Sequence, residues 1–177
     1  VLFGLATVLF ALQVAFVQPP LSSAGERPVE AGTTAPDFTL NDLEGNPVTL
    51  GSLLSKGKWV VLSFWGVRCS SCLEEMKVLN QLSAKWGPRG VAFLGVNADS
   101  AEGSVLKELV PKVGAQADYP LLSDPEMKVV DLYQMRVAPL TLVINSEGKV
   151  VFRHEGYEPG DEKKLEDVLG AIIAASK

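Results

Sequence analysis

The sequence predicts an α/β domain with a central mixed β-sheet flanked by helices on both faces. Two apolar runs of strand length, residues 58–65 and 90–97, are each followed by a helical pattern, as parallel strands with helical crossovers require. Two further runs, residues 140–145 and 149–154, flank the turn residues SEG and predict an antiparallel hairpin. With 177 residues, 47% of them hydrophobic, the chain is long enough for one such domain and short for two.

Residues 1–24 predict a signal peptide or an N-terminal membrane anchor. Residues 1–17, VLFGLATVLFALQVAFV, carry no charge, and their length lies between a signal-peptide core and the roughly 20 residues of a spanning helix. The small residues Ser22 and Ala24 suit cleavage by signal peptidase, whereas a retained anchor fits the apolar length nearly as well. A buried globular helix is the weakest interpretation because the stretch is apolar on every side. Both main interpretations place the domain outside the cytoplasm.

The next elements form an N-terminal β extension of the predicted sheet. Residues 18–34 are rich in Pro, Ser, Gly and Thr, which predicts a linker at residues 25–34, before the domain at residues 35–177. Residues 37–40 and 47–50 flank the turn NDLEGN and predict a hairpin or a pair of short extended segments. A helical turn near Leu53 then leads into the first apolar strand.

The remaining elements are helices that alternate with the strands already named. Helical patterns cover residues 70–86, after the first apolar strand, and residues 101–113, after the second. The stretch DPEMKVVDLYQM predicts another helix, with Asp124 at the N-cap and Pro125 at the first helical position. A last amphipathic helix is predicted at residues 161–175.

Both cysteines of the chain lie in SFWGVRCSSCLEEM, as Cys69 and Cys72. This Cys-x-x-Cys pair has three interpretations: a redox centre, half of a zinc site, or a structural disulfide. Structural zinc needs four ligands, and the chain offers only His154 besides the two cysteines. A disulfide that closes so short a loop stabilises little, and a domain of this size does not need it. The sequence therefore favours a redox pair.

The predicted strand before Cys69 and the helix after it give this cysteine its expected chemistry. A thiol at a helix N-terminus faces unpaired amides and the positive end of the helix dipole, which favour the nucleophilic thiolate. Arg68 adds a positive charge next to it, although an ordinary solvated side chain is an equal interpretation. Cys72, one turn further and more buried, is placed to attack a mixed disulfide on Cys69.

The helical pattern adds Glu75 to the candidate site. On a helical wheel Glu75 falls inside the apolar arc that contains Cys72, whereas Glu74 falls at its polar edge. A carboxyl group that faces the core has a raised pKa through desolvation and could exchange protons with the cysteines. The alternative is a surface glutamate near the favourable end of the helix dipole. Pro139, before the strand at 140–145, marks a bend there.

Several of these stretches resemble the extracytoplasmic thioredoxin-like proteins of the TlpA/ResA type. The resemblance rests on APDFTLNDLEGNPVTLGSLLSKGKWVVLSFWGVRCSSCLEEM, then GVAFLGVNAD, APLTLVINSEGKVVFRHEGY and a closing helix, about residues 35 to 175. It implies a thioredoxin fold and dithiol/disulfide exchange with protein substrates. It also implies that Cys69 attacks and Cys72 resolves. No cofactor beyond this redox-active pair, and no metal, is implied.

The resemblance also implies roles for residues outside the cysteine pair. Pro139 matches the cis-proline that lies against the disulfide, and Ala138 matches the residue whose backbone pairs with the substrate chain. Glu75 matches a buried acid found in some members. Trp65 matches the aromatic residue beneath the active site, with plain core packing as an equal alternative.

Two positions depart from the family pattern. Arg68 stands where most members have Trp, so a flat apolar contact surface is replaced by a charge and an acidic partner is expected. Ser63 stands where thioredoxins have a buried Asp, which leaves Glu75 as the candidate proton acceptor.

Two rival functions remain open. A peroxiredoxin-like thiol peroxidase shares the fold, but Gly66 stands where its Thr is required. A non-enzymatic copper or haem delivery module would use both thiolates and His154, whose plainer interpretation is a partly exposed strand residue.

The sequence also predicts the partners of the protein. With a net charge of -5 and no run of Lys or Arg, it is not expected to bind nucleic acid. The family suggests the reducing direction, clients such as apocytochrome c or copper-site proteins, and a membrane thiol reductant as electron donor. We expect a monomer outside the cytoplasm, in the periplasm or cell envelope, secreted or anchored through its N-terminal segment.

Overall fold

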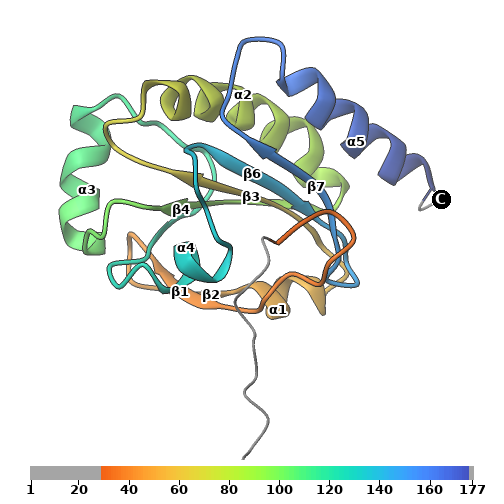
Figure 1. Cartoon of the computed structure of the whole chain (residues 1–177), viewed down its shortest axis with the longest axis horizontal. Helices are drawn as coiled ribbons and strands as arrows, with labels where there is room; N and C mark the ends of the chain where they lie inside the picture. The colour runs from red at the N-terminus through yellow and green to blue at the C-terminus, as the bar shows by residue number, and fades with distance from the viewer. Residues whose placement is uncertain (1–28, 176–177) are drawn as a thin grey trace, which may run out of the picture.

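A computed structural model describes residues 29–175 as one mixed sheet between two layers of helices (Figure 1). The predicted signal peptide or anchor, residues 1–24, lies outside these residues. The strands are β1 (Thr39–Asp42), β2 (Pro47–Thr49), β3 (Trp59–Trp65), β4 (Val91–Asn97), β5 (Leu121–Ser123), β6 (Leu140–Ile144) and β7 (Val150–Glu155). The helices are α1 (Leu50–Leu54), α2 (Ser70–Trp86), α3 (Gly103–Lys112), α4 (Lys128–Leu132) and α5 (Glu162–Ala175), with a short 3-10 helix η1 (Gly87–Arg89) after α2.

The strand order across the sheet is β2-β1-β5-β4-β3-β6-β7. Strands β3, β4 and β5 are parallel, and β6 and β7 add to β3 as an antiparallel hairpin. The β1–β2 hairpin pairs antiparallel with β5 and forms the expected N-terminal extension. The mixed sheet predicted from the sequence is therefore confirmed.

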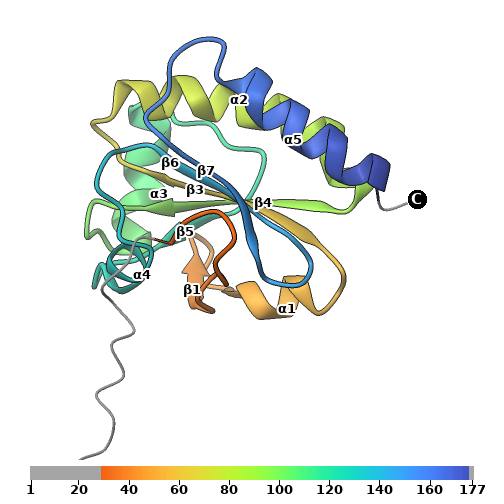
Figure 2. The same cartoon turned by 45° about the vertical axis from the view of Figure 1, so that its right-hand side comes forward.

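Apolar side chains form one core on each side of the sheet. Helices α2 and α5 lie side by side over one face, while α1 and α4 cover the other (Figures 1 and 2). The central strand β3 alternates between the two cores: Leu62 and Phe64 face the α1 side, and Val61 and Trp65 face the α2 side. Because β3 is buried on both faces, its sequence is an almost unbroken apolar run.

The helix predicted from Asp124 is shorter than expected. Met127 adopts a left-handed backbone conformation with φ of 57°, which interrupts the helix, so that α4 begins only at Lys128. The Asp124 carboxylate still binds the start of the helix, because its Oδ2 accepts hydrogen bonds from the amides of Val129 and Val130, both at 2.9 Å. The capping prediction was thus correct in its chemistry and wrong in its position.

The described part of the expected linker, from Val29, is attached to the β6–β7 hairpin. Val29 is buried in the core of the α1 side. The amide of Gly32 donates to the carbonyl of Val150, and the amide of Val150 donates to the carbonyl of Thr33. The chain is thus hydrogen-bonded to the domain several residues before Ala35. Within residues 29–175, no helix is both long and apolar enough to cross a membrane.

Candidate active site

The two cysteines lie where β3 ends and α2 begins, and they form a disulfide. The S–S bond is 2.03 Å long and the two Cα atoms are 5.2 Å apart. Cys69 is the N-cap of α2, and its Sγ accepts a hydrogen bond from the amide of Cys72 at 3.2 Å. Cys69 is partly exposed, whereas Cys72 is 1% exposed. Only one sulfur of the pair is thus open to a partner molecule.

The loop that carries Cys69 is held in place from the neighbouring strand. Oδ2 of Asp99 accepts a 2.7 Å hydrogen bond from the amide of Val67 and a 2.8 Å bond from Nδ2 of Asn97. The Asn97 side chain is itself buried, and its Oδ1 accepts a hydrogen bond from the amide of Asp99. Gly66 fits closely under this arrangement, because a Cβ atom there would lie 3.1 Å from Oδ1 of Asp99.

Glu75 lies one turn beyond Cys72 on the buried face of α2, as the wheel predicts, and is 5% exposed. Two hydroxyl groups from neighbouring strands bind its carboxylate. Ser63 Oγ on β3 donates to Oε2 at 2.9 Å, and Thr141 Oγ1 on β6 donates to Oε1 at 2.6 Å. Glu74, by contrast, is exposed and pairs with Lys77.

Burial governs the protonation of Glu75. Desolvation raises the pKa of its carboxyl group, which opposes the smaller lowering by the hydrogen bonds from Thr141 and Ser63. His154 lowers this pKa further and Asp161 raises it, both through charge. A buried carboxyl group with a raised pKa, one helical turn from Cys72, is suited to exchange protons with a neighbouring thiol.

The segment before β6 lies beside the end of β3. Leu140 pairs with Phe64, so the residues that precede it extend along the strand end that leads to Cys69. The Ala138–Pro139 peptide bond is cis and Pro139 is buried. The Pro139 carbonyl accepts a 2.7 Å hydrogen bond from the amide of Gly156. Ala138 is half-buried against the apolar cluster that also contains Cys69.

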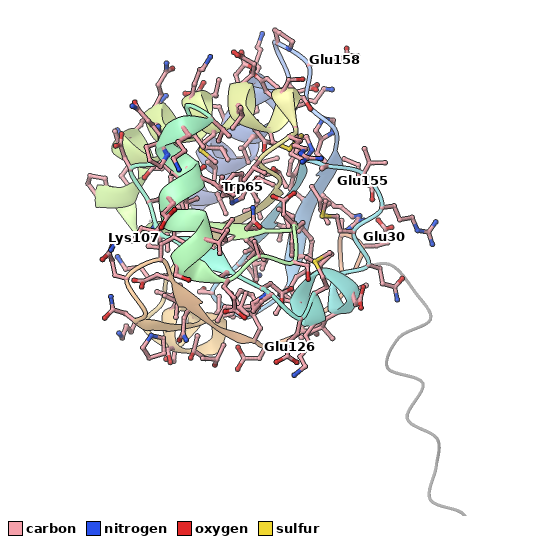
Figure 3. The ribbon with its side chains drawn as sticks, turned by 90° about the vertical axis from the view of Figure 1, so that its left-hand side faces the viewer. Glu30, Trp65, Lys107, Glu126, Glu155 and Glu158 are labelled. Atoms are coloured by element: carbon pink, nitrogen blue, oxygen red, sulfur yellow. A yellow bond between two sulfur atoms is a disulfide. The ribbon has the colours of Figure 1, made fainter. Side chains whose placement is uncertain are left out.

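The two remaining predicted residues differ in exposure. Trp65 is 1% exposed, lies inside the molecule (Figure 3) and belongs to the same buried apolar cluster as Cys72. Its Nε1 has no hydrogen-bond acceptor among the described residues. Arg68 is exposed, and none of residues 29–175 forms an ion pair with it.

His154 is partly exposed and lines the same small pocket as Glu75. Its Nε2 lies 3.0 Å from Oδ2 of Asp161, which also lines this pocket. Across the described part of the chain, no group of three or more His, Cys, Asp or Glu side chains is arranged to hold a metal ion.

Sequence reasoning missed three residues of this site: Thr141, Asp99 and Asp161. Thr141 carried a detectable signal, since a hydroxyl group in the middle of the apolar run LTLVI needs a buried partner. Ser63 departs from the family pattern, and nothing in the sequence indicates its hydrogen bond to Glu75. Asp99 and Asp161 lie in loops whose course depends on the tertiary structure, and no sequence signal identified them.

A family model described as the AhpC/TSA family matches residues 31–153. The chain is 34% identical over 149 residues to a thiol-disulfide oxidoreductase ResA of Bacillus thuringiensis strain Al Hakam, covering 84% of this chain and 82% of the relative. The ResA of Halalkalibacterium halodurans is 36% identical over 126 residues, which are 71% of this chain and 69% of that protein.

Solved structures agree with these relatives. A DsbE-like thiol:disulfide interchange protein from Chlorobium tepidum superposes with a TM-score of 0.73 at 30% identity, over 82% of this chain and 99% of that one. The thioredoxin domain of a thiol-disulfide oxidoreductase from Bacteroides vulgatus gives a TM-score of 0.64 at 26% identity, over 79% and 98% of the two chains. The expected thioredoxin-like fold is confirmed.

Proposed function

This chain belongs to the AhpC/TSA family and is a thiol-disulfide oxidoreductase, and from that premise we propose that it reduces disulfide bonds of client proteins outside the cytoplasm. The observation that carries the proposal is the juxtaposition of a partly exposed Cys69 at the N-cap of α2 with a buried Cys72 and a buried Glu75 on that helix. This arrangement separates the attacking thiol, the resolving thiol and a proton acceptor along one helix.

Cys69 is the attacking residue in this proposal. In the dithiol state its sulfur remains at the N-terminus of α2, where the Cys72 amide and the helix dipole stabilise a thiolate. The thiolate attacks a client disulfide, so that a bond from Cys69 to one client sulfur forms, the client S–S bond breaks and a client thiolate leaves.

Cys72 then completes the transfer of two electrons. Its thiol gives a proton to the Glu75 carboxylate, and its sulfur attacks Cys69 to form the intramolecular disulfide and release the second client thiolate. The client gains two electrons, the cysteine pair loses two, and the proton resides on Glu75. Because desolvation raises the pKa of Glu75, this carboxyl group holds a proton at a higher pH than an exposed glutamate does.

Two residues contact the client in this proposal, and a third supports the site from within the core. Ala138, before the cis-proline Pro139, offers its backbone to an extended client segment in the manner of an added strand. Arg68 is exposed next to Cys69 and favours clients with acidic residues beside their cysteines. Trp65 acts only through packing beneath the disulfide, since it is almost completely buried.

The reducing direction requires an external source of electrons. We place the domain, residues 35–177, in the periplasm or cell envelope, because the apolar segment at residues 1–24 suits export or anchoring. A membrane thiol reductant would then restore the dithiol, and apocytochrome c or copper-site proteins are suitable clients.

Equilibration with glutathione tests the direction. We expect a midpoint reduction potential well below about −120 mV, the value of a strong oxidant, and a value near that figure would overturn the reductase proposal. The same preparation distinguishes the rivals. Rapid consumption of hydrogen peroxide would favour a thiol peroxidase, and copper(I) binding that is lost in His154→Ala would favour a delivery module.

A further inference from the structure

A small pocket adjoins Glu75 between α2, the β6–β7 hairpin and the start of α5. Its volume is about 10 Å³, enough for roughly one water molecule. The apolar part of its wall comes from Val78, Leu79, Phe152 and Leu165. Its polar lining comes from a second set: Glu75, Thr141, His154, Tyr157, Asp161 and Glu162. The mechanism proposed above places a proton on Glu75 and assigns no use to these other groups.

Thr141 and His154 connect the inner end of the pocket to its outer end. They are direct partners in the β6–β7 register, so their side chains lie on the same face of the sheet. Thr141 touches the Glu75 carboxylate at 2.6 Å. His154 lies beyond it, with 27% of its side chain exposed, and therefore reaches both the pocket and solvent.

Asp161 orients the imidazole of His154. The 3.0 Å contact holds Nε2 of His154 close to Asp161, in the loop before α5. The imidazole ring also stacks on Phe152 and lines the pocket. Asp161 is itself fixed by the amide of Glu158 at 2.9 Å and by the Lys164 ammonium at 2.8 Å. These donors, Lys164 first, hold the pKa of Asp161 well below its usual range, so it remains a carboxylate.

We propose that this pocket is the route by which the proton taken up by Glu75 reaches solvent, with His154, oriented by Asp161, as the residue that passes it on. The proposal rests on the function proposed above, since it needs Glu75 to accept the proton of Cys72. His154 is a positioning residue in this scheme, because it acts on Glu75 and does not touch the reacting sulfurs.

The other ionisable groups around Glu75 are poorly suited to this task. Burial and a hydrogen bond to Glu162 raise the pKa of Tyr157 to about 12, and burial raises the pKa of Tyr119 still further, so both stay neutral. Glu162 has a lowered pKa through backbone hydrogen bonds and stays ionised. Histidine is the side chain that ordinarily takes up and releases protons between about pH 5 and 8.

The proton balance of one turnover defines the experiment. A mixed disulfide is prepared between Cys69 and a thiol of low pKa that absorbs light when released. Attack by Cys72 forms the Cys69–Cys72 bond, releases the coloured thiolate and leaves one proton on Glu75, which must reach the bulk. A stopped-flow instrument follows the coloured thiolate and a pH-indicator dye at low buffer concentration.

In the wild type, the dye signal should accompany release of the thiolate. In His154→Gln, which keeps a side-chain amide near Asp161 but no titratable nitrogen, the dye signal should lag by about tenfold or more. Added imidazole should remove the lag in His154→Ala. Glu158→Gln is the matched control, because Glu158 is an exposed residue of the loop before Asp161 (Figure 3) and does not line the pocket. The substitution keeps the backbone amide that binds Asp161.

Each outcome bears on one proposal. Simultaneous signals in both His154 variants, with melting temperatures close to that of the wild type, would overturn the relay. A lag that imidazole does not shorten would also overturn it, because a merely structural role of His154 explains such a lag. Failure of thiolate release in the wild type would instead contradict the proposed oxidoreductase mechanism, whereas release with normal pH dependence in Glu75→Gln would contradict the role of Glu75.

Discussion

The hydroxyl of Ser63 donates a 2.9 Å hydrogen bond to Oε2 of Glu75, and this contact joins the central strand β3 to the helix that carries both cysteines. Thr141 makes the matching contact from β6 at 2.6 Å. The carboxylate is thus held by one hydroxyl group on each side, and Glu75 as a whole is 5% exposed. The position of Glu75 relative to Cys72 therefore depends on α2, β3 and β6 together.

Substitution of the two cysteines should have different results. Cys69→Ser should abolish exchange, because the exposed nucleophile is lost. Cys72→Ser should instead accumulate a mixed disulfide with the client, since the buried resolving thiol is missing. Non-reducing electrophoresis and mass spectrometry of reaction mixtures would detect this species, and a stable adduct formed by Cys69→Ser would reverse the assignment.

Glu75→Gln should change the pH profile of exchange. The amide keeps the shape and can still meet Ser63 and Thr141, but it cannot accept the Cys72 proton. We expect the rate of resolution to fall by about 100-fold near neutral pH, in the range of general acid–base catalysis. Glu74→Gln on the exposed face of the same helix is the control. Superimposable profiles for Glu75→Gln and the wild type would remove the proposed role.

The same residue should make stability depend on pH. Burial raises the pKa of Glu75 above its ordinary value of 4.5, so folding favours the protonated form. This contribution is fully present below pH 4.5 and is lost as the pH rises through the raised pKa of the folded state. The free energy of unfolding of oxidised Glu75→Gln, measured with urea, should therefore fall less over that interval than that of the wild type. Parallel curves would contradict the raised pKa.

Asp99 should position the loop before Cys69. In Asp99→Ala the amide of Val67 loses its 2.7 Å acceptor, and Asn97 loses a partner. We expect a loss of about 1 kcal/mol of stability, since a net hydrogen bond contributes about that much, together with slower attack by Cys69. Urea unfolding and single-turnover kinetics measure the two effects. Asp118→Ala, which also replaces an exposed loop aspartate, serves as the control. Equal kinetics in both variants would contradict the role of Asp99 in positioning the loop before Cys69.

Arg68 should select acidic clients. Arg68→Glu is expected to lower kcat/KM for a disulfide peptide with flanking acidic residues by about tenfold at low salt, and the effect should shrink as salt screens the charges. Arg89→Glu, at the far end of α2 near Trp86, controls for the change of net charge. If the two variants respond alike to salt, then Arg68 has no specific contact with the client.

The cysteine pair, the strand before it and the helix after it were predictable because they depend on local periodicity. The same holds for the burial of Glu75, which follows from its angle on the helix. The short α4 was not predictable, since the left-handed conformation of Met127 is uncommon for a residue other than Gly and no turn residue marks the position. The hydrogen bond from the Val67 amide to Asp99 joins residues 32 positions apart, and no local sequence pattern predicts such a contact.

The sequence by itself determined the candidate site residues: two cysteines at helical spacing, an acid on the buried face of their helix, and a proline before a strand. These features follow from side-chain type and from helical or strand periodicity, which are local properties of the sequence. Only the tertiary structure decided what surrounds the acid. Ser63, Thr141 and His154 come from three strands, and their convergence on Glu75 depends on the register of β6 with β3 and β7. Register is set by packing across the whole sheet, because a shift of one residue would turn each of these side chains to the opposite face.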